Sequence, residues 1–455
     1  MMAKINIASW LAVLFSVILL LFPSLSSLEA YQGRMLAIMI LAVVLWISEL
    51  IPVYATGLLI ICLQLIFLSD RGLKWLVDDG APLAYQDVMA NFASPIVILF
   101  LGGFSLASAA NKYKIDRIMA HSLLKPFGTR PRFIMLGMMV ITALFSMFMS
   151  NTATTAMMLA ILSPVLAGLP EDEPSRKGFL LSVPLAANVG GIGTPIGTPP
   201  NAVALKYLSA NTPISFGSWM AFGIPLVILF LTLGWWWLNT LYKPATPRLE
   251  LKIERPKVRP RVAMIFYGTF ASTIFLWLTS AFHGLNSYIV ASIPLTIFFA
   301  TGILDKGDIK KFNWEVLWLI AGGIALGQGM ADSGLSQKLI ELIPTAAMSI
   351  ALLLIVFSAL AYLMANFISN TATANLLLPL VATVVTGFQA DDSMAVALVQ
   401  IALVCSFGMA FPISTPPNAL AYSTGLIDSR DLLKTGGFIS VLGLIFVTAM
   451  GYLLL

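Results

Sequence analysis

The five residues Ser150-Asn151-Thr152-Ala153-Thr154 recur unchanged as Ser369-Asn370-Thr371-Ala372-Thr373, 219 positions later. Each copy, here called an SNT motif, is followed by a TPPN motif. In the TPPN pair, Pro195-Ile196-Gly197-Thr198-Pro199-Pro200-Asn201-Ala202 corresponds to Pro412-Ile413-Ser414-Thr415-Pro416-Pro417-Asn418-Ala419 with an offset of 217. A Gly-Gly pair precedes each SNT motif, at 102–103 and at 322–323. The same order of three motifs in both halves predicts an internal structural repeat.

The composition indicates that lipid surrounds most of the chain. Of its 455 residues, 59% are hydrophobic and 10% are charged, whereas soluble domains carry about 25% charged residues. The mean hydropathy is +0.92, and apolar runs near the ~20 residues that cross a bilayer recur along the sequence. Backbone groups must find partners inside lipid, so these runs are expected to be helices. The chain is therefore predicted to be an all-α polytopic membrane protein. Its net charge of +5 gives no reason to expect nucleic acid as a partner.

About eleven apolar stretches are expected to be transmembrane helices. They lie near residues 8–22, 34–50, 51–69, 92–111, 176–210, 217–241, 262–282, 287–303, 313–332, 394–424 and 433–454. Two further apolar stretches, 133–169 and 344–388, are too long for one span and contain no Lys, Arg, Asp or Glu. Each is predicted to form a re-entrant helical hairpin that carries an SNT motif at its tip.

The distribution of basic residues predicts the orientation. With the N-terminus in the cytoplasm, 21 of the 26 Lys and Arg residues fall on the cytoplasmic side, as the positive-inside rule requires. The C-terminus then lies outside, and the two hairpins open toward opposite sides. This arrangement is an inverted-topology repeat, which is common among secondary transporters. Residues 24–30 lack a clear signal-peptide cleavage site, so the first helix is expected to be retained in a protein of the inner (cytoplasmic) membrane.

The TPPN motifs are expected to interrupt helices beside a binding site. Two adjacent prolines remove two amide donors and clash with the preceding helical turn. Unwound backbone at membrane depth is tolerated where it lines a cavity or is buried in protein. The freed carbonyl groups suit a hard cation such as Na⁺, and the half-helix that starts after the prolines directs its positive end to the same place.

The SNT motifs supply polar side chains at the hairpin tips. Ser, Asn and Thr are efficient N-caps and offer hydroxyl and amide donors. Each motif would lie at the N-terminus of the returning helix and hold one carboxylate. The two sets are Ser150, Asn151 and Thr152, and Ser369, Asn370 and Thr371. Such a pair suits a small dianion with a carboxylate at each end. A single SNT motif is more often a hydrogen-bonding patch between helices, but two copies with matched TPPN motifs favour a binding site.

No charged residue accompanies these motifs. Apart from residues at the first two positions of a span, Lys206 is the only basic residue inside a predicted span, and its expected role is to reach the membrane interface with its ammonium group. Without a fixed cation, co-bound sodium ions are the simplest way to offset a doubly negative substrate. Glu49 is an intramembrane acid and therefore a functional candidate, but a structural role is preferred for it. The Gly-Gly pairs fit close helix packing as well as a functional helix break.

Other function classes fit the sequence less well. An intramembrane enzyme would need a nucleophile with a nearby base, or metal ligands, and Ser150 has no His or Lys beside it in sequence. Cys62 and Cys405 lie in apolar stretches without a metal-ligand pattern, and His121 and His283 lie far apart. Enzymatic activity is therefore not expected. A passive channel is a further alternative, but broken helices in inverted repeats fit alternating access better.

At these residues the chain resembles the divalent-anion:sodium symporter family, in particular its bacterial INDY-type dicarboxylate transporters. The resemblance covers almost the whole chain and rests on the SNT and TPPN motifs and on the stretch Trp46-Ile47-Ser48-Glu49-Leu50-Ile51-Pro52. It implies a homodimer that carries C4-type dicarboxylates together with sodium by an elevator-type mechanism. No organic cofactor is implied.

The resemblance also implies roles for individual residues. Substrate contacts would come from Asn151, Thr152, Thr198, Asn370, Thr371, Thr415 and Pro416, beside the tip serines Ser150 and Ser369. One sodium site would use Ser146, Ser150, Asn151 and Gly197, and a second would use Asn370 with the backbone around Ala365 and Ser414. Ala365 is the repeat equivalent of Ser146 and brings no side-chain oxygen. The second site would therefore depend on carbonyl groups.

The implied domains alternate along the chain. Residues 1–132 would form scaffold helices, and 133–242 the hairpin and broken helix of a transport domain. After a Pro-, Lys- and Arg-rich cytoplasmic linker at 243–261, residues 262–343 and 344–455 would repeat the two parts. Some members of the family exchange substrates without sodium. A sodium-independent dicarboxylate exchanger of the same fold therefore stays open, as does, more remotely, transport of sulfate or arsenite.

Overall fold

The structure is a computed structural model that describes residues 7–74, 82–208, 214–249, 257–341, 349–388 and 393–454. The described residues form helices joined by turns and loops and contain no β-strand, only one isolated bridge between Ser69 and Leu83. The first half forms α1 Ile7–Leu21, α2 Ala30–Ser48, α3 Val53–Phe67, α4 Tyr85–Ala90, α5 Pro95–Lys112, α6 Ile115–Leu124, α7 Pro131–Ser146, α8 Asn151–Ala167, α9 Ser175–Gly191, α10 Pro199–Leu208 and α11 Phe216–Leu241. The second half forms α12 Pro260–Leu278, α13 Ser280–His283, α14 Ser287–Ala300, α15 Lys306–Ile309, α16 Trp314–Asp332, α17 Leu335–Glu341, α18 Ile350–Phe367, α19 Asn370–Gly387, α20 Met394–Ser406, α21 Pro416–Tyr422, α22 Ser429–Leu432 and α23 Phe438–Leu454. The all-α prediction is confirmed.

Many of these helices have the composition of membrane spans. Six helical stretches among the described residues are long and apolar enough to cross a bilayer: Ala30–Ser48, Tyr85–Lys112, Phe216–Leu241, Pro260–Leu278, Ile350–Phe367 and Ser429–Leu454. Shorter apolar helices of 10–17 residues accompany them. Large apolar side chains such as Met264, Phe275 and Leu453 lie exposed on the surface, as lipid contact would allow. The number of eleven spans stays a prediction.

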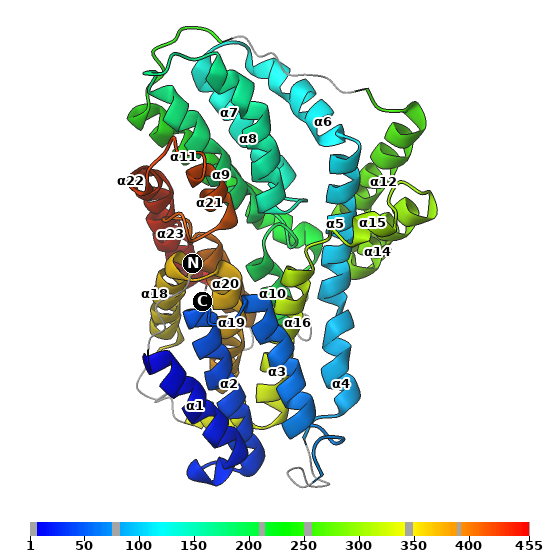
Figure 1. Cartoon of the computed structure of the whole chain (residues 1–455), viewed down its shortest axis with the longest axis vertical. Helices are drawn as coiled ribbons and strands as arrows, with labels where there is room; N and C mark the ends of the chain where they lie inside the picture. The colour runs from blue at the N-terminus through cyan, green and yellow to red at the C-terminus, as the bar shows by residue number, and fades with distance from the viewer. Residues whose placement is uncertain are drawn as a thin grey trace.

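Both apolar stretches predicted to form hairpins consist of two successive helices, while their re-entrant course in the membrane stays a prediction. α7 ends at Ser146 and α8 begins at Asn151, while α18 ends at Phe367 and α19 begins at Asn370. Each SNT motif therefore lies where a helix returns, as predicted. In Figure 1 α7 and α8 occupy the upper part of the molecule, and α18 and α19 lie in the lower part.

Both predicted helix breaks are also present. α9 ends at Gly191 and α10 starts at Pro199, while α20 ends at Ser406 and α21 starts at Pro416. The prediction that each second half-helix starts after the prolines is wrong, because the prolines themselves form its first turn. Proline is favourable there, since its missing N–H would have no intrahelical partner and its φ is already helical.

The two repeats exchange their short half-helices. α10, from the first half, packs against α19 and α20 of the second half, whereas α21 packs against α8 and α9 of the first half. Each hairpin thus lies beside the short half-helix of the other repeat. Both halves of the chain are needed to build the region between the two hairpin tips.

The Gly-Gly pairs serve close helix packing. A side chain at Gly102 in α5 would collide with the backbone of Ala291 in α14, and one at Gly322 in α16 would collide with Gly57 in α3. Both α5 and α16 continue as helices through these positions. Of the two interpretations that the sequence left open, the structure therefore agrees with packing.

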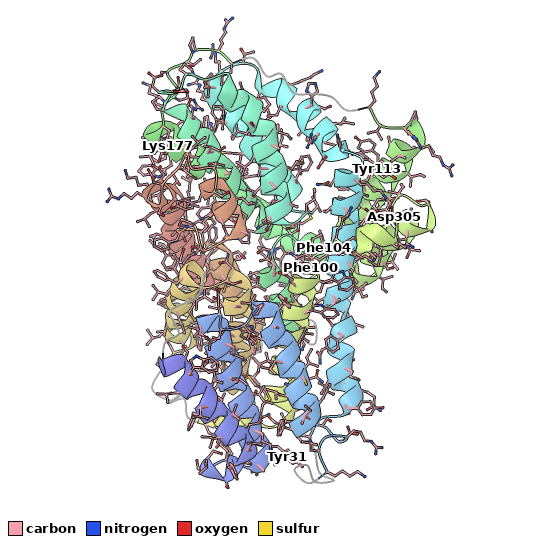
Figure 2. All side chains as sticks on the ribbon, viewed as in Figure 1. Tyr31, Phe100, Phe104, Tyr113, Lys177 and Asp305 are labelled. Carbon is pink, nitrogen blue, oxygen red and sulfur yellow. The ribbon has the colours of Figure 1, made fainter. Side chains whose placement is uncertain are left out.

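Two ion-pair clusters tie the halves of the chain together at helix ends. Lys112 of α5 pairs with Asp305, the N-cap of α15, and with Asp308 inside α15, with nitrogen–oxygen distances of 2.9 and 2.5 Å. Lys177 of α9 pairs with Asp431 of α22 at 2.7 Å. Lys177 and Asp305 lie on opposite flanks of the molecule in Figure 2. The first cluster joins elements expected to form the scaffold, and the second joins elements expected to form the transport domain.

Lys206 does not have the place expected for it. It lies in α10 and is partly buried, and its Nζ donates a hydrogen bond of 2.7 Å to the Ile324 carbonyl of α16. The interpretation as a side chain that reaches the membrane interface is therefore wrong, because the ammonium group bonds to a neighbouring helix instead.

One carboxylate holds the start of the predicted linker. Glu173, in the turn between α8 and α9, accepts hydrogen bonds of 2.7–3.0 Å from the N–H groups of Ala245 and Thr246 and from the hydroxyls of Thr246 and Ser175. Burial alone would raise the pKa of Glu173, but these donors lower it to about 2. Linker residues 250–256 lie outside the described residues.

We expect Glu173→Gln to destabilise the protein in a pH-dependent way. The folded-state pKa lies below the ordinary value of 4.5, so the carboxylate stabilises the fold fully above that pH and loses this effect as the pH falls toward 2. At neutral pH the lost bonds to a charged acceptor should cost about 1.5–3 kcal/mol. Thermal unfolding in detergent should show a gap between variant and wild type that narrows in acid, with Glu171→Gln as the control. A gap that does not change with pH would contradict this account.

Candidate functional site

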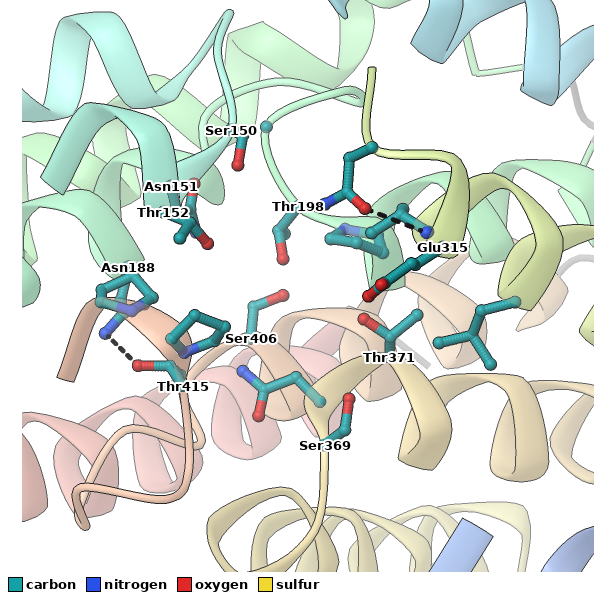
Figure 3. A pocket seen from close by; sticks show the side chains of 18 of the residues that line it. Ser150, Asn151, Thr152, Asn188, Thr198, Glu315, Ser369, Thr371, Ser406 and Thr415 are labelled. Atoms are coloured by element: carbon teal, nitrogen blue, oxygen red, sulfur yellow. Dashed lines mark hydrogen bonds between the residues drawn. The ribbon is translucent and has the colours of Figure 1, made fainter. Parts of the chain in front are cut away.

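The hairpin tips and the helix breaks line one cavity of about 510 Å³. Small-molecule sites typically have about 300–1,000 Å³. All nine residues predicted to contact substrate line it: Ser150, Asn151, Thr152, Thr198, Ser369, Asn370, Thr371, Thr415 and Pro416. Figure 3 shows the first tip on one side of this space and the second tip on the other. Motifs far apart in sequence are thus brought together, while their contact with a substrate stays a prediction.

Four helix N-termini meet at the cavity. They begin at Asn151 in α8, Pro199 in α10, Asn370 in α19 and Pro416 in α21, and all four residues line the cavity. Neither Ser150 nor Ser369 uses its side chain to cap its helix, so both hydroxyls are left for other partners. Each N-terminus carries a positive partial charge equivalent to roughly half an elementary charge. The cavity can therefore attract an anion without a basic side chain.

The asparagine of each TPPN motif holds the unwound segment before it. The Asn201 amide donates to the carbonyl groups of Gly191 and Thr194 at 3.1 and 2.9 Å. The Asn418 amide donates to two carbonyl groups in the second loop, each at 2.9 Å. Both asparagines are buried. The motifs were predicted only as helix breaks, although the fixed position of the asparagine after the prolines could have indicated this role.

Further polar contacts join the two breaks across the repeats. Asn188, in the last turn of α9, donates to Thr415 Oγ1 at 3.1 Å and to Asn418 Oδ1 at 3.2 Å, and Figure 3 shows the first of these bonds. Ser406, at the end of α20, lies 3.5 Å from Asn201 Oδ1. Neither Asn188 nor Ser406 was predicted, because neither belongs to a recognisable motif.

The first predicted sodium site has oxygen atoms that suit a hard cation. Ser146 Oγ lies 2.5 Å from Asn151 Oδ1 and 2.7 Å from the Ala187 carbonyl oxygen. A Cβ atom at Gly191 would lie 2.9 Å from Asn151 Oδ1 and 3.0 Å from the Gly197 carbonyl oxygen. The glycine therefore leaves space that a side chain would fill beside both oxygens. Hard cations prefer hydroxyl, amide and carbonyl oxygens of this kind, so these residues fit a sodium ion.

The second predicted sodium site is built differently. Ala365 is buried without a side-chain oxygen, and a Cβ atom at Gly408 would lie 2.8 Å from its carbonyl oxygen. The Ser414 hydroxyl donates to the Asn366 carbonyl at 2.7 Å. The Oδ1 atom of Asn370 is buried and has no hydrogen-bond partner among the described residues. Because buried polar atoms rarely lack a partner, this atom fits a ligand-binding role.

The wall that faces the tips carries carboxylates. None of the described residues that line the cavity is Lys, Arg or His. Glu315, in the first turn of α16, and Glu49, at the end of α2, both line it. In Figure 3 the Glu315 carboxylate points toward Thr371. A structural role was preferred for Glu49, but its side chain also lines the cavity. Glu315 was not predicted, because no motif surrounds it.

Comparison with known proteins identifies the family. The family model for the sodium:sulfate symporter transmembrane region matches residues 4–454. The chain belongs to this family. The resemblance to divalent-anion:sodium symporters is thus confirmed, and the family and the relatives that match are named as symporters or transporters, not as enzymes.

This symporter-family chain is similar to several curated proteins. It is 32% identical over 451 residues to an uncharacterized transporter of Schizosaccharomyces pombe, covering 95% of this chain and 50% of that protein. It is 30% identical over 440 residues to the inorganic phosphate transporter PHO87 of Saccharomyces cerevisiae, covering 93% and 47%. It is 30% identical over 488 residues to the sodium-dependent dicarboxylate transporter SdcS of Staphylococcus saprophyticus, covering 97% and 89%. The chain spans about half the length of the two yeast relatives.

Two solved transporter structures share the fold of this family member. The Alcanivorax borkumensis YdaH transporter matches with a TM-score of 0.56 and 14% identity, over 80% of this chain and 86% of that chain. MtrF of Neisseria gonorrhoeae matches with a TM-score of 0.52 and 12% identity, over 90% and 96%. At such identities the likeness concerns the fold alone.

We expect Asn418→Ala to destabilise the second loop. The change leaves the Met409 carbonyl without its buried donor, while the Phe411 carbonyl keeps the Ser414 N–H, and an unsatisfied buried group costs about 1–3 kcal/mol. Thermal unfolding in detergent should show a lower midpoint than for wild type, and Asn111→Ala, at an exposed position, should show little change. Equal midpoints for Asn418→Ala and wild type would mean that the loop does not depend on this side chain.

Proposed function

We propose that the protein carries C4-type dicarboxylates such as succinate, malate or fumarate across the cytoplasmic membrane by sodium-coupled symport. The observation that carries this proposal is the cavity between two equivalent SNT tips, where four helix N-termini meet and no basic side chain of the described residues takes part. Two equivalent tips fit a ligand with two equivalent anionic groups. The similarity to the sodium-dependent dicarboxylate transporter SdcS supports the same substrate class.

Sodium would offset the charge of the substrate. Burying an unpaired carboxylate costs several kcal/mol even after relaxation. Hydroxyls, amides and helix ends of the cavity can stabilise two such groups, but Glu49 and Glu315 add negative charge to its lining. One ion would be held by Ser146, Ser150, Asn151 and Gly197, and a second by Asn370 with backbone near Ala365 and Ser414. Because binding free energies are reciprocal, sodium and substrate should tighten each other's binding by the same factor.

Transport would occur by an elevator-type movement within a homodimer. The hairpins and broken helices would move against the remaining helices, with the N-terminus in the cytoplasm and the C-terminus outside. The two ion-pair clusters support two separate bodies, because Lys112–Asp308 joins elements of the proposed scaffold and Lys177–Asp431 joins elements of the proposed transport domain. Both bodies could then keep their internal contacts while they move.

Two alternatives have an observation in their favour. Sodium-independent exchange is favoured by the second sodium site, where Asn370 supplies a side-chain oxygen but Ala365 cannot. Phosphate transport is favoured by the similarity to the inorganic phosphate transporter PHO87. Phosphate has one anionic group and would need only one SNT tip. Both tips line the cavity, which favours a dicarboxylate.

Uptake of labelled succinate into proteoliposomes tests the proposal. We expect uptake with an inward sodium gradient and little uptake when choline replaces sodium. Asn151→Ala and Asn370→Ala should each weaken succinate binding by tenfold or more, because each loses a bond to a charged group worth about 1.5–3 kcal/mol. Asn111→Ala should bind like wild type.

Other outcomes of this experiment would replace the proposal. Uptake that requires internal dicarboxylate and ignores sodium would establish exchange instead of symport. If phosphate inhibits the uptake and malate and fumarate do not, the substrate is not a C4-type dicarboxylate. Near-normal succinate affinity in both asparagine variants would show that the tips do not bind the carboxylates.

We expect Glu315→Gln to tighten succinate binding. Its carboxylate lines the cavity and points toward the second tip, so it opposes a dianion bound there. Glu315 is exposed, so the gain should be modest: about two- to fivefold in Kd at low salt, and smaller at high salt. Calorimetric titration at two salt concentrations measures the effect. Glu341→Gln is the control, because that carboxylate pairs with Lys338 away from the cavity. Weaker binding in Glu315→Gln would instead make this carboxylate a contact that the ligand needs.

A further inference from the structure

Two polar side chains reach the backbone of α16 without lining the cavity. Lys206 Nζ of α10 donates to the Ile324 carbonyl at 2.7 Å, and Asn375 Nδ2 of α19 donates to the Leu319 carbonyl at 3.2 Å. Both donors belong to elements of the proposed transport domain, whereas α16 belongs to the proposed scaffold. These bonds therefore cross the boundary along which the two bodies would move.

Glycines open one face of α16 to these side chains. A side chain at Gly323 would collide with the Asn375 amide, and one at Gly327 would collide with the Tyr207 hydroxyl. Gly323 and Gly327 are four residues apart and so lie on the same face of the helix. Polar groups of α10 and α19 can therefore lie directly on the α16 backbone, where larger residues would keep them away.

Another face of α16 is bonded to the proposed scaffold. Gln64 Nε2 of α3 donates to the Ala325 carbonyl at 2.9 Å, and Gly57 of α3 lies against Gly322. The carbonyls of Ile324 and Ala325, one residue apart, thus bond to elements on opposite sides of the proposed boundary. The Lys206–Ile324 bond would have to break when the transport domain moves, whereas the Gln64–Ala325 bond would not. The two bonds can therefore be compared directly.

Lys206 is the only one of these donors to α16 that has an ionisable side chain. Asp332, at the C-terminal end of α16, acts electrostatically on the Lys206 ammonium group as an opposite charge. Hydrogen bonds with an ionised donor are stronger than neutral ones. A shift of α10 along α16 would break the bond to Ile324 and change the distance to Asp332. The bond to Ile324 therefore favours the register that the structure shows, and Asp332 adds to it when the amine is protonated.

We propose that Lys206 is a positioning residue for the transport step, which holds α10 at one register on α16 and must release the Ile324 carbonyl before the transport domain moves. This inference rests on the proposed elevator movement. A purely apolar contact would pack at many registers along a glycine-lined helix, whereas a bond to one carbonyl selects a single register. Lys206 would thus bias the equilibrium between the two arrangements while it lies outside the cavity.

Ser336 and Thr383 offer a reporter of this register. Their hydroxyl oxygens, on α17 and α19, lie 3.2 Å apart across the same proposed boundary. Cysteines at both positions should form a disulfide on mild oxidation only while this register is occupied, because disulfide geometry tolerates little separation. The full-length chain would carry Cys62→Ser to remove the exposed thiol, and the buried Cys405 would stay.

We expect Lys206→Met to slow disulfide formation roughly three- to tenfold, because loss of a bond to a charged group lowers the population of this register. Lys206→Arg, which keeps the charge and the donors, should restore most of the wild-type rate. The matched control is Gln64→Met, which removes the bond to the Ala325 carbonyl from the scaffold side and should leave the rate unchanged. If Lys206→Met does not fold, Lys206→Gln takes its place with the same expectation.

A wild-type rate in the Lys206 variant, or an equal slowing in Gln64→Met, would overturn the proposal. The first result would mean that the bond does not fix the register, and the second that any contact on α16 has the same effect. Oxidation is measured without substrate, so the outcome does not depend on the transported anion. If the rate depends on Lys206 but succinate is not taken up, the positioning role holds and the substrate assignment fails.

Discussion

Backbone groups that leave a helix at membrane depth need hydrogen-bond partners, and the arrangement around the cavity depends on how this chain supplies them. The prolines of each TPPN motif start a new helix, and the asparagine that follows turns back to bond the carbonyls of the unwound segment, as Asn201 does with Gly191 and Thr194. The segments are therefore irregular but held in place. Because they are held, the N-termini of α10 and α21 keep a fixed direction toward the cavity.

The exchange of short half-helices makes the two repeats depend on each other. α10 packs in the second half and α21 packs in the first, and Asn188 bonds both Thr415 and Asn418 of the opposite repeat. The helix at each tip therefore packs against a half-helix of the other repeat, and the position of a ligand at one tip depends on both repeats. The two carboxylates of one substrate would then bind to elements that pack against each other. A carrier that moves its binding site as one rigid body requires such packing.

Local chemistry explains why much of this fold could be predicted and some of it could not. The helix breaks follow from paired prolines and the hairpins from apolar runs too long for one span, so both were predicted from the sequence. The repeated motifs also indicated that the two tips share a site. Asn188, Ser406 and Glu315 could not be found in this way, because their roles come only from proximity in space. Lys206 was misplaced for the same reason: hydropathy gives the depth of a residue, not the helix that lies beside it.

The repeats differ most at the oxygens proposed to hold sodium. In the first repeat Ser146 and Asn151 bring side-chain oxygens together. In the second repeat Ala365 replaces the serine, and Asn366 ties its own tip instead: its carbonyl accepts from Ser414 and its Oδ1 accepts from the Ala410 N–H. Protein bonds order the first tip as well, because Ser146 donates to the Ala187 carbonyl and Thr194 to the Met147 carbonyl. The repeats therefore differ in the oxygens that they offer a cation: side-chain oxygens of Ser146 and Asn151 at the first hairpin, and carbonyl groups with Asn370 Oδ1 at the second.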